Sequence, residues 1–488
     1  MNQSFWSKFF KRNETKTVIA SLISIIIGMA AGSIIIAIVG LTNESMGGKS
    51  VLDGIRIVFA GMFCTGRDLT GSGALNFGFN PVETGNMLFR ATPLILTGLS
   101  VALAYKTGLF NIGAPGQYLA GTAATLFIAL SIPVKGSQMT EWHALQDILA
   151  ALNNPETFPV MSEWMKNTLN VDASALIEQW GILAKSNVPN DSMVKSMIEW
   201  MAGMNLNPSE LLNAWQTSQG MNTAFLFPAW SVWTLAFIGG LVAGAVWGAL
   251  PGLMKAILNI NEVIACIMTN WIAANLVSWL FDMSNLKNMF EGTKTTYIYK
   301  SSFNGVETPK LGLDKIFTGS QVNGGIIIAI LLAVVVLILL SRTTFGYELK
   351  ACGSNRFAAR YAGIKDKRSI VVSMALAGSL AGAAGALYSL AGNTEFAWNC
   401  YQSLPAVGFN GIPVALLAAN NPIGVVFSGM FMSMLNICGS QLTKLTSFNE
   451  YITDVIIAVI VYLSAFSLVI KQLISGVKKR RNGKEAAK

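Results

Sequence analysis

Neutral amide side chains are the groups in this sequence best suited to bind a small molecule, because they lie in stretches that are otherwise apolar. Amides donate and accept hydrogen bonds, and the aromatic rings beside them stack on planar groups. This combination suits a neutral, planar or ring-shaped molecule such as a sugar or a nucleoside. The alternative for each amide is a hydrogen bond between two helices. The candidate residues are Asn111, Gln117, Asn270, Asn275, Phe409 and Asn410.

Charged groups for catalysis or ion coupling are scarce in the same stretches. Glu262, Asp282 and Asp454 lie at their ends, where solvation removes most of the cost of a charge. No phosphate-loop, kinase, hydrolase or dinucleotide fingerprint is present. The five cysteines and the single histidine, His143, have no metal-ligand spacing. We therefore expect neither an enzyme nor a resident cofactor or metal.

One long polar segment, residues 344–368, interrupts the apolar stretches. Counting the flanking Arg342, it carries seven basic residues against two acids, Glu348 and Asp366. The positive-inside rule places such a segment in the cytoplasm. Helix formers dominate it, and Gly353 and Gly363 are the predicted breaks, so two short helices are expected there.

Composition makes this an all-α, polytopic membrane protein: 52% of 488 residues are apolar and 12% are charged. A span needs about 20 apolar residues. With an even number of spans and the N-terminus inside, both termini are predicted to be cytoplasmic, and the first span is an uncleaved helix. Residues 51–63 predict an external interfacial helix. The ten expected spans are about 17–41, 88–105, 108–133, 226–250, 262–281, 323–341, 369–391, 404–419, 422–439 and 452–471.

The net charge of +9 is explained by cytoplasmic loops, the termini and contact with anionic membrane lipid, so no nucleic-acid partner is expected. The predicted regions are N-terminal helices in 1–134, an insertion in 135–222, a transmembrane core in 223–471 and a basic cytoplasmic tail in 472–488.

Short or broken helices are predicted at two places. Almost no loop separates the spans at 106–108 and at 420–422, and each pair carries a similar word, Gly98–Ala104 and Gly411–Leu417. Pro115, between Gly113 and Gly116, predicts a break in the third span. Such interruptions in two halves of a membrane protein are typical of a binding site near the membrane midplane.

Small residues at four-residue spacing predict close helix packing within the chain, in preference to a dimer interface. They are Gly240, Gly244 and Gly248 in one span and Gly378 and Gly382 in another.

The insertion contains 9 acidic residues and 4 lysines, and its composition favours helices. A word that begins at Ser162-Glu163-Trp164-Met165 and ends at Trp180 recurs from Ile198-Glu199-Trp200-Met201 to Trp215. By topology the insertion is extracellular. The tryptophans predict the core of a small helical domain; a docking platform for an extracellular partner is the alternative.

Four words resemble permeases of ABC importers of the branched-chain amino acid, ribose and nucleoside type, most closely the nucleoside and simple-sugar subgroup. Phe110–Gln117 (FNIGAPGQ) is similar to the family's NIG-x-E-G-Q word, with Pro115 where glutamate is common. Gly346–Ile364 resembles the family's coupling region. The other two words are Ile260–Ala273 and Gly408–Gly424. The insertion is not part of the common family pattern.

The resemblance implies a transport subunit of the bacterial cytoplasmic membrane that imports a nucleoside. Its implied partners are a separate cytoplasmic ABC ATPase that binds ATP and Mg²⁺, a second related permease and an extracellular solute-binding lipoprotein. The ATPase would contact Glu348, Ala351, Gly353, Ala358, Ala359 and Gly363. Three alternatives stay open: import of a monosaccharide such as ribose or galactose, a passive channel or secondary carrier, and a structural membrane protein.

Overall fold

The computed structural model describes residues 13–42, 48–68, 73–185, 190–221, 225–288, 296–399, 403–449 and 451–465. The basic tail and Cys400 lie outside these ranges. A helix occurs at each of the ten expected spans, which confirms the all-α fold class. These helices are α2 (Asn13–Thr42), α4 (Pro81–Lys106), α5 (Ala114–Ser131), α11 (Ala229–Leu258), α12 (Glu262–Asp282), α14 (Gly325–Arg342), α17 (Asp366–Ser389), α18 (Ala406–Leu417), α19 (Pro422–Leu445) and α20 (Tyr451–Ala465).

Seven of the described helices are long and apolar enough to cross a membrane: α2, α4, α11, α12, α14, α17 and α19. The expected span at 404–419 is instead a short helix, because α18 has 12 residues where about 20 are needed. α18 lies against α4, and the two similar words meet at this crossing. A methyl group at Gly411 would overlap the backbone of Thr97, and one at Gly98 would overlap Val414.

The glycine stripes pack α11 against α17, as predicted for packing within the chain. A methyl group at Gly244 would overlap the carbonyl oxygen of Gly378, and one at Gly382 would overlap the carbonyl oxygen of Gly240. α5 joins the same contact, because Gly121 faces Gly382. Without side chains at the crossing the helix backbones touch, so α5, α11 and α17 form the most closely packed part of the core.

Shorter elements connect these helices. A helix lies over most of 51–63 as expected, α3, and its side chains Val51, Ile57 and Val58 are buried. The strands form two small antiparallel pairs, β1 with β2 and β3 with β4. The bounds are α3 (Gly48–Ala60), η1 (Gly61–Phe63), β1 (Cys64–Arg67), β2 (Leu75–Phe77), β3 (Tyr297–Ile298), η2 (Ser301–Asn304), α13 (Leu313–Ile316), α15 (Thr344–Ser354), α16 (Arg356–Tyr361) and β4 (Phe396–Ala397).

The insertion contains five helices with a hydrophobic cluster of their own. Each copy of the tryptophan word forms one helix pair, α7 with α8 and α9 with α10. The copies touch each other through Trp164 and Trp215, whose ring centroids are 5.4 Å apart. Met165 and Met201, which occupy the same place in the two copies, are both fully buried. The bounds are α6 (Gln138–Asn153), α7 (Phe158–Leu169), α8 (Ala173–Lys185), α9 (Asn190–Gly203) and α10 (Pro208–Ser218).

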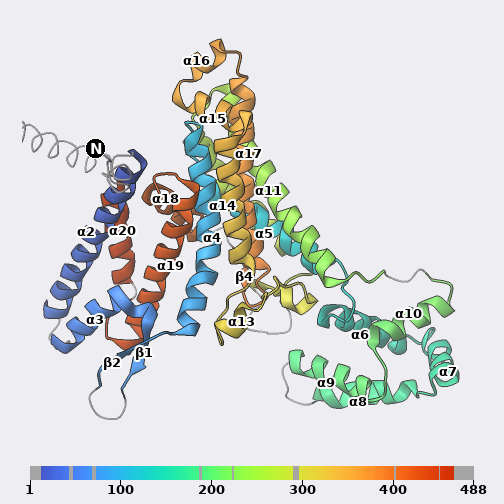
Figure 1. Cartoon of the computed structure of the whole chain (residues 1–488). Helices are drawn as coiled ribbons and strands as arrows, with labels where there is room; N and C mark the ends of the chain where they lie inside the picture. Colours follow the sequence, from blue (N-terminus) through green and yellow to red (C-terminus); the bar gives the residue numbers. More distant parts are fainter. Residues whose placement is uncertain are drawn as a thin grey trace, which may run out of the picture.

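The insertion leaves and rejoins the core at one place. Lys135 N–H donates to the carbonyl oxygen of Phe227 at 3.0 Å, and Phe227 N–H donates to that of Pro133 at 3.0 Å. Figure 1 places the insertion at one end of the molecule and the pair α15–α16 at the other. If the long helices cross a membrane, these two elements face its opposite sides, as the sequence predicts.

Candidate solute path and coupling surface

Two of the predicted amides, Asn111 and Gln117, form a closed, buried pair at the turn between α4 and α5. Asn111 Nδ2 donates to Gln117 Oε1 at 2.8 Å and to Ser100 Oγ at 2.9 Å. Gln117 Nε2 donates back to Asn111 Oδ1 at 3.0 Å, and the N–H of Gly113 donates to the same oxygen. The amide hydrogen-bonding groups of Asn111 are therefore used within the chain.

Asn270 of α12 holds the same turn from the other side. Its Oδ1 accepts from Gly116 N–H at 2.9 Å, and its Nδ2 donates to the carbonyl oxygen of Ile112 at 3.0 Å. The three amides, from α12 and from the ends of one turn, are thus brought together. We call Asn111, Gln117 and Asn270 the amide cluster. It fixes the backbone of residues 111–117, where the helical hydrogen bonds are interrupted.

The other three predicted path residues lie elsewhere. Asn275 is exposed on α12, and its Nδ2 donates to the carbonyl oxygen of Trp271 at 2.8 Å. Phe409 is exposed and Asn410 is half-buried on α18. α18 still adjoins the cluster, because a methyl group at Gly408 would overlap the backbone of Pro115. Among the described residues, neither Asn275 nor Asn410 hydrogen-bonds to the amide cluster.

Pro115 starts a helix instead of breaking one, so the expected break is wrong. α5 begins at Ala114, which places Pro115 in its first turn. The first turn needs no N–H from proline, and the fixed φ of proline favours helix initiation there.

The polar segment forms the two expected helices, α15 and α16. Asn355 separates them with extended backbone, and its Oδ1 accepts from Ala358 N–H at 3.0 Å, which caps α16. Gly363 follows with a φ of +85°, so it is a break, as expected. Gly353 as the other break is wrong, since it lies inside α15. An asparagine that caps the second helix ends the first one here.

An ion-pair clamp joins α16 to the start of α17. Asp366 Oδ2 accepts from Arg356 Nε at 2.7 Å and from Arg360 Nη2 at 2.7 Å. The hydrogen bond to Asp366, reinforced by its negative charge, raises the pKa of the Arg360 guanidinium. The Asp366 carboxylate is buried while Arg360 is largely exposed, so the clamp anchors α16 and leaves its outer face free.

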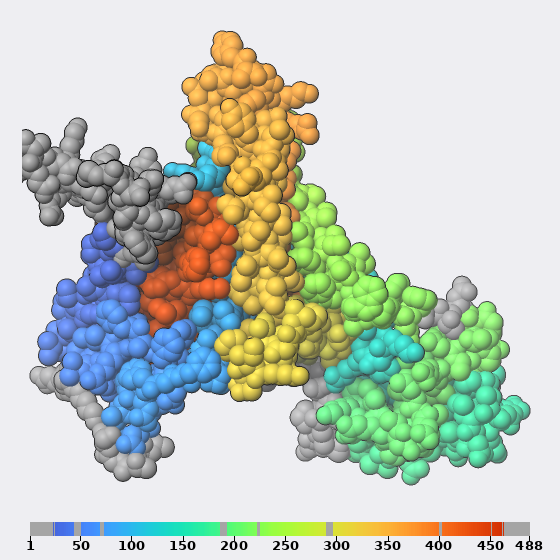
Figure 2. All heavy atoms as spheres, in the orientation of Figure 1, coloured from blue at the N-terminus to red at the C-terminus, as the bar shows by residue number. Residues whose placement is uncertain are grey.

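The outer face of α15 and α16 carries three aromatic side chains that sequence reasoning missed. Tyr347 is 69% exposed, Phe357 72% and Tyr361 94%. A hollow of about 480 Å³ lies on this segment and is lined in part by Tyr347 and Ala358. Figure 2 shows the segment projecting beyond the body of the molecule. Aromatic residues in a basic loop were the available signal, since exposed rings mark contact surfaces.

The six residues predicted to contact an ATPase differ in how much of each is exposed to solvent. Ala358 and Gly363 are exposed, whereas Glu348 and Ala351 are half-buried. Ala359 is buried beneath α16. The sixth, Gly353, is also half-buried and packs inward.

Gly353 connects the polar segment to the amide cluster. A methyl group at Gly353 would overlap the carbonyl oxygen of Lys106 and approach the backbone of Thr107 and Gly108. Gly108 has a φ of +72°, so the turn needs a glycine at this point. The hydroxyls of Thr107 and Ser373 hydrogen-bond at 2.6 Å, which ties the turn to α17. α15 is therefore in direct backbone contact with the turn that leads to Asn111.

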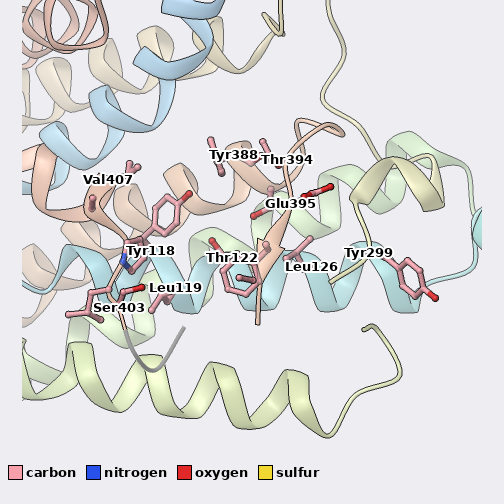
Figure 3. Close-up of a pocket in the computed structure, with 16 residues that line it drawn as sticks. Tyr118, Leu119, Thr122, Leu126, Tyr299, Tyr388, Thr394, Glu395, Ser403 and Val407 are labelled. Atoms are coloured by element: carbon pink, nitrogen blue, oxygen red, sulfur yellow. Dashed lines mark hydrogen bonds between the residues drawn. The ribbon is translucent and has the colours of Figure 1, made fainter. Parts of the chain in front are cut away.

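A cavity of about 520 Å³ lies beside the cluster, between α5, the end of α17 and the start of α18. Its wall contains aromatic rings and hydroxyl groups from four separate segments (Figure 3). Sequence reasoning identified none of its lining residues. Those on the helices include Tyr118, Leu119, Thr122, Leu126, Tyr388 and Ser389; those on the connecting segments include Tyr299, Thr394, Glu395, Phe396, Ser403 and Leu404.

The sequence is similar to known permeases along most of its length. It is 27% identical to the guanosine ABC transporter permease protein NupP of Bacillus subtilis, over 95% of this chain and 97% of that protein. It is 26% identical to the nucleoside ABC transporter permease protein NupB of Lactococcus lactis, over 96% and 95%. For the glucose ABC transporter permease protein TsgB13 of Haloferax volcanii the identity is 23%, over 82% and 80%.

No solved structure gives a significant match to this chain. The family model for the permease component of the branched-chain amino acid transport system matches residues 192–465, more than half of the chain. Together with the seven apolar helices, this match makes the chain a multi-pass membrane protein and a member of that family of ABC transporter permeases.

Proposed function

We propose that this chain is the transmembrane permease subunit of an ATP-driven importer of nucleosides. The observation that carries the proposal is the direct backbone contact between Gly353 of α15 and the α4–α5 turn at Gly108. It links an exposed aromatic surface, through the amide cluster, to α5, which lines a solute-sized cavity. The similarity to guanosine and nucleoside permeases supports the cargo.

The surface formed by α15 and α16 is the proposed docking site for a separate cytoplasmic ATPase. ATP and Mg²⁺ would bind to that partner. Exposed rings at Tyr347, Phe357 and Tyr361 would fill its groove, and Ala358 would allow a close approach. The clamp at Asp366 joins α16 to the start of α17, so a displacement of α16 would also reach the core.

The proposed motion starts at this surface. Closure of the ATPase displaces α15, Gly353 moves the Thr107–Gly108 turn, and the amide cluster carries the displacement to the start of α5 and to α12. Since α5 forms one wall of the cavity, the displacement opens the cavity toward one side of the membrane and then the other. A second permease and an extracellular solute-binding lipoprotein complete the proposed assembly, with both termini of this chain in the cytoplasm.

A monosaccharide is the second candidate cargo, because the glucose permease of Haloferax volcanii is also similar to this chain. It leaves the coupling mechanism unchanged.

Uptake of labelled guanosine and labelled glucose by cells that contain the complete system tests the proposal. We expect ATP-dependent guanosine uptake, reduced about tenfold by Tyr361→Ala through loss of a central docking contact. Tyr451→Ala is the matched control, since Tyr451 is an exposed tyrosine outside the docking surface. Uptake that survives ATP depletion would indicate a channel or carrier. Uptake of glucose but not of guanosine would show that the cargo is a monosaccharide and not a nucleoside.

A further inference from the structure

The rings that line the cavity are held from behind by other rings. Tyr388, at the end of α17, stacks on the buried Phe89 of α4, with centroids 5.8 Å apart. Phe396 of β4 packs on the buried Phe281 of α12, with centroids 5.5 Å apart. A ring fixed in this way loses little freedom when a ligand stacks on it. The wall is therefore preorganised for a flat partner.

A third pair completes the wall. Tyr299, which follows β3, stacks on Phe303 at a centroid distance of 4.9 Å. β3 pairs with β4, so Phe396 lies in this small sheet and Tyr299 directly follows it. Figure 3 shows Tyr118 of α5 lining the cavity together with these segments. These positions share no sequence periodicity, and only the fold brings them to one cavity.

Charge on the cavity wall is balanced. Glu395 is the only formally charged residue among the described lining residues, and its carboxylate pairs with Lys300 at 3.1 Å. A free amino acid would bring a carboxylate and an ammonium group, and each would need an opposite charge on the wall. The wall supplies no cation for the carboxylate. The cavity therefore fits a neutral ligand better than the amino acid in the family's name.

Polar groups remain available for such a ligand. The Tyr118 side chain is 5% exposed, and within the described part of the chain its hydroxyl makes no hydrogen bond. Thr394 and Ser389 donate their hydroxyl hydrogens to backbone carbonyls at 2.7 Å, which leaves oxygen lone pairs that can accept. Thr122 Oγ1 on the same wall is a buried oxygen without a hydrogen-bond partner among the described residues, and such a group costs free energy unless a ligand completes its hydrogen bond.

We propose that this cavity binds the nucleoside during translocation, with its planar base against the aromatic wall and a hydrogen bond to the Tyr118 hydroxyl. Tyr118 is then a specificity-determining residue, and Tyr388 and Phe396 are the stacking residues. This inference rests on the proposed function and adds the binding site within the chain. It also explains a volume of about 520 Å³, which lies within the range of about 300–1,000 Å³ typical of small-molecule sites.

Protection of an introduced cysteine tests the site directly. Ser403 is exposed and lines the cavity, so Ser403→Cys should react with a thiol reagent. Cys400→Ser removes a neighbouring thiol, and Cys64, Cys266, Cys352 and Cys438 are buried. The labelling is done on the full chain in cells with the complete system, with guanosine, glucose or leucine present. Ser218→Cys, at an exposed serine on α10, is the control.

We expect guanosine to slow labelling at position 403 but not at 218, and leucine to have no effect. Tyr118→Phe, which keeps the ring, should raise the half-protecting guanosine concentration about threefold to tenfold, as expected for one lost hydrogen bond. Normal guanosine uptake without protection at 403 would overturn the site and leave the proposed function intact. Absence of guanosine uptake in the unmodified strain would overturn the proposed function itself. Protection by leucine or by glucose alone would overturn the nucleoside assignment.

Discussion

The amide cluster and the aromatic cavity both include a residue of α5, Gln117 and Tyr118, yet they use polar groups in opposite ways. In the cluster, the side chains of Asn111 and Gln117 hydrogen-bond to each other, and that of Asn270 hydrogen-bonds to the backbone of the turn. Tyr118, the residue after Gln117, lines the cavity, and its hydroxyl makes no hydrogen bond within the described part of the chain. Whether a polar residue in an apolar helix serves structure or ligand binding thus depends on its hydrogen-bond partners, and the residue type alone does not show it.

The largest expected effect comes from breaking the amide cluster. Asn111→Ala leaves Gln117, Ser100 and the N–H of Gly113 without their partner in a buried place. Each buried unpaired group costs about 1–3 kcal/mol, so we expect at least about 3 kcal/mol of destabilisation. Thermal unfolding of the purified permease should show a clearly lower Tm. Asn275→Ala, at an exposed amide, should change stability by less than about 0.5 kcal/mol.

If Asn111→Ala keeps normal stability but no longer imports guanosine, the amide cluster binds the solute and its role is not structural. The contrast drawn here between the amide cluster and the cavity would then be wrong.

Two glycines of the polar segment give the next largest effect. Gly353→Ala places a methyl group on the backbone of Lys106 and should cost about 1–3 kcal/mol by overpacking, with strongly reduced uptake. At Gly363 a methyl group would meet nothing, although its positive φ makes alanine costly by about 1–2 kcal/mol locally. Comparing uptake and Tm between the two variants distinguishes loss of the contact at Gly353 from strain in the turn at Gly363. Equal loss of uptake would argue against a special role for Gly353.

A cavity variant should lower uptake without changing stability to the same degree. Phe396→Leu keeps an apolar side chain on a half-buried position but removes the stacking surface. Aromatic stacking contributes about 0.5–1.5 kcal/mol, so guanosine uptake at low concentration should fall about threefold to tenfold. The measurement is the initial rate of uptake beside the Tm of the purified variant. A fall in Tm as large as that of Asn111→Ala would mean that the ring is part of the core.

The smallest effect is expected at the clamp. Asp366→Asn weakens three hydrogen bonds from two arginines that are partly exposed, so the cost is about 0.5–1 kcal/mol after solvent screening. Hydrogen exchange in α16 should become faster, while exchange in α5 and in the amide cluster stays unchanged. Faster exchange in α5 would show that the clamp also stabilises the cavity wall.

The helices could be predicted well because a membrane span has a simple sequence pattern, an apolar run of sufficient length. The glycine stripes were equally readable, since only close helix packing needs Gly240, Gly244 and Gly248 at one spacing. The length of the helix at 404–419 was overestimated, because the apolar run includes residues 404–405 before the helix start at Ala406 and residues 418–419 after its end at Leu417. The two short helices in 344–368 were predicted correctly. Gly353 was interpreted as a helix break, whereas its role in the structure is a close packing contact.

The site was much less predictable than the helices. Pairing of Asn270 with Gly116 joins residues 154 positions apart, which no local pattern specifies. The cavity wall combines Tyr118, Tyr299 and Phe396 from three distant segments, each unremarkable in its own sequence context. Residue types directed attention to amides and aromatic rings, but only the fold shows which of these side chains have a free face.

The hydrogen bonds that join Pro133, Lys135 and Phe227 bring the two ends of the insertion together, so a linker of a few residues could replace α6–α10. Met139 and Val194 of the insertion also pack in one hydrophobic cluster with Leu119 and Phe281 of the core. We expect such a shortened chain to keep the core, although Ser137 would no longer hydrogen-bond to Asn304. We expect that another domain can be grafted at these ends, provided that it covers the core side chains that Met139 and Val194 cover in this chain.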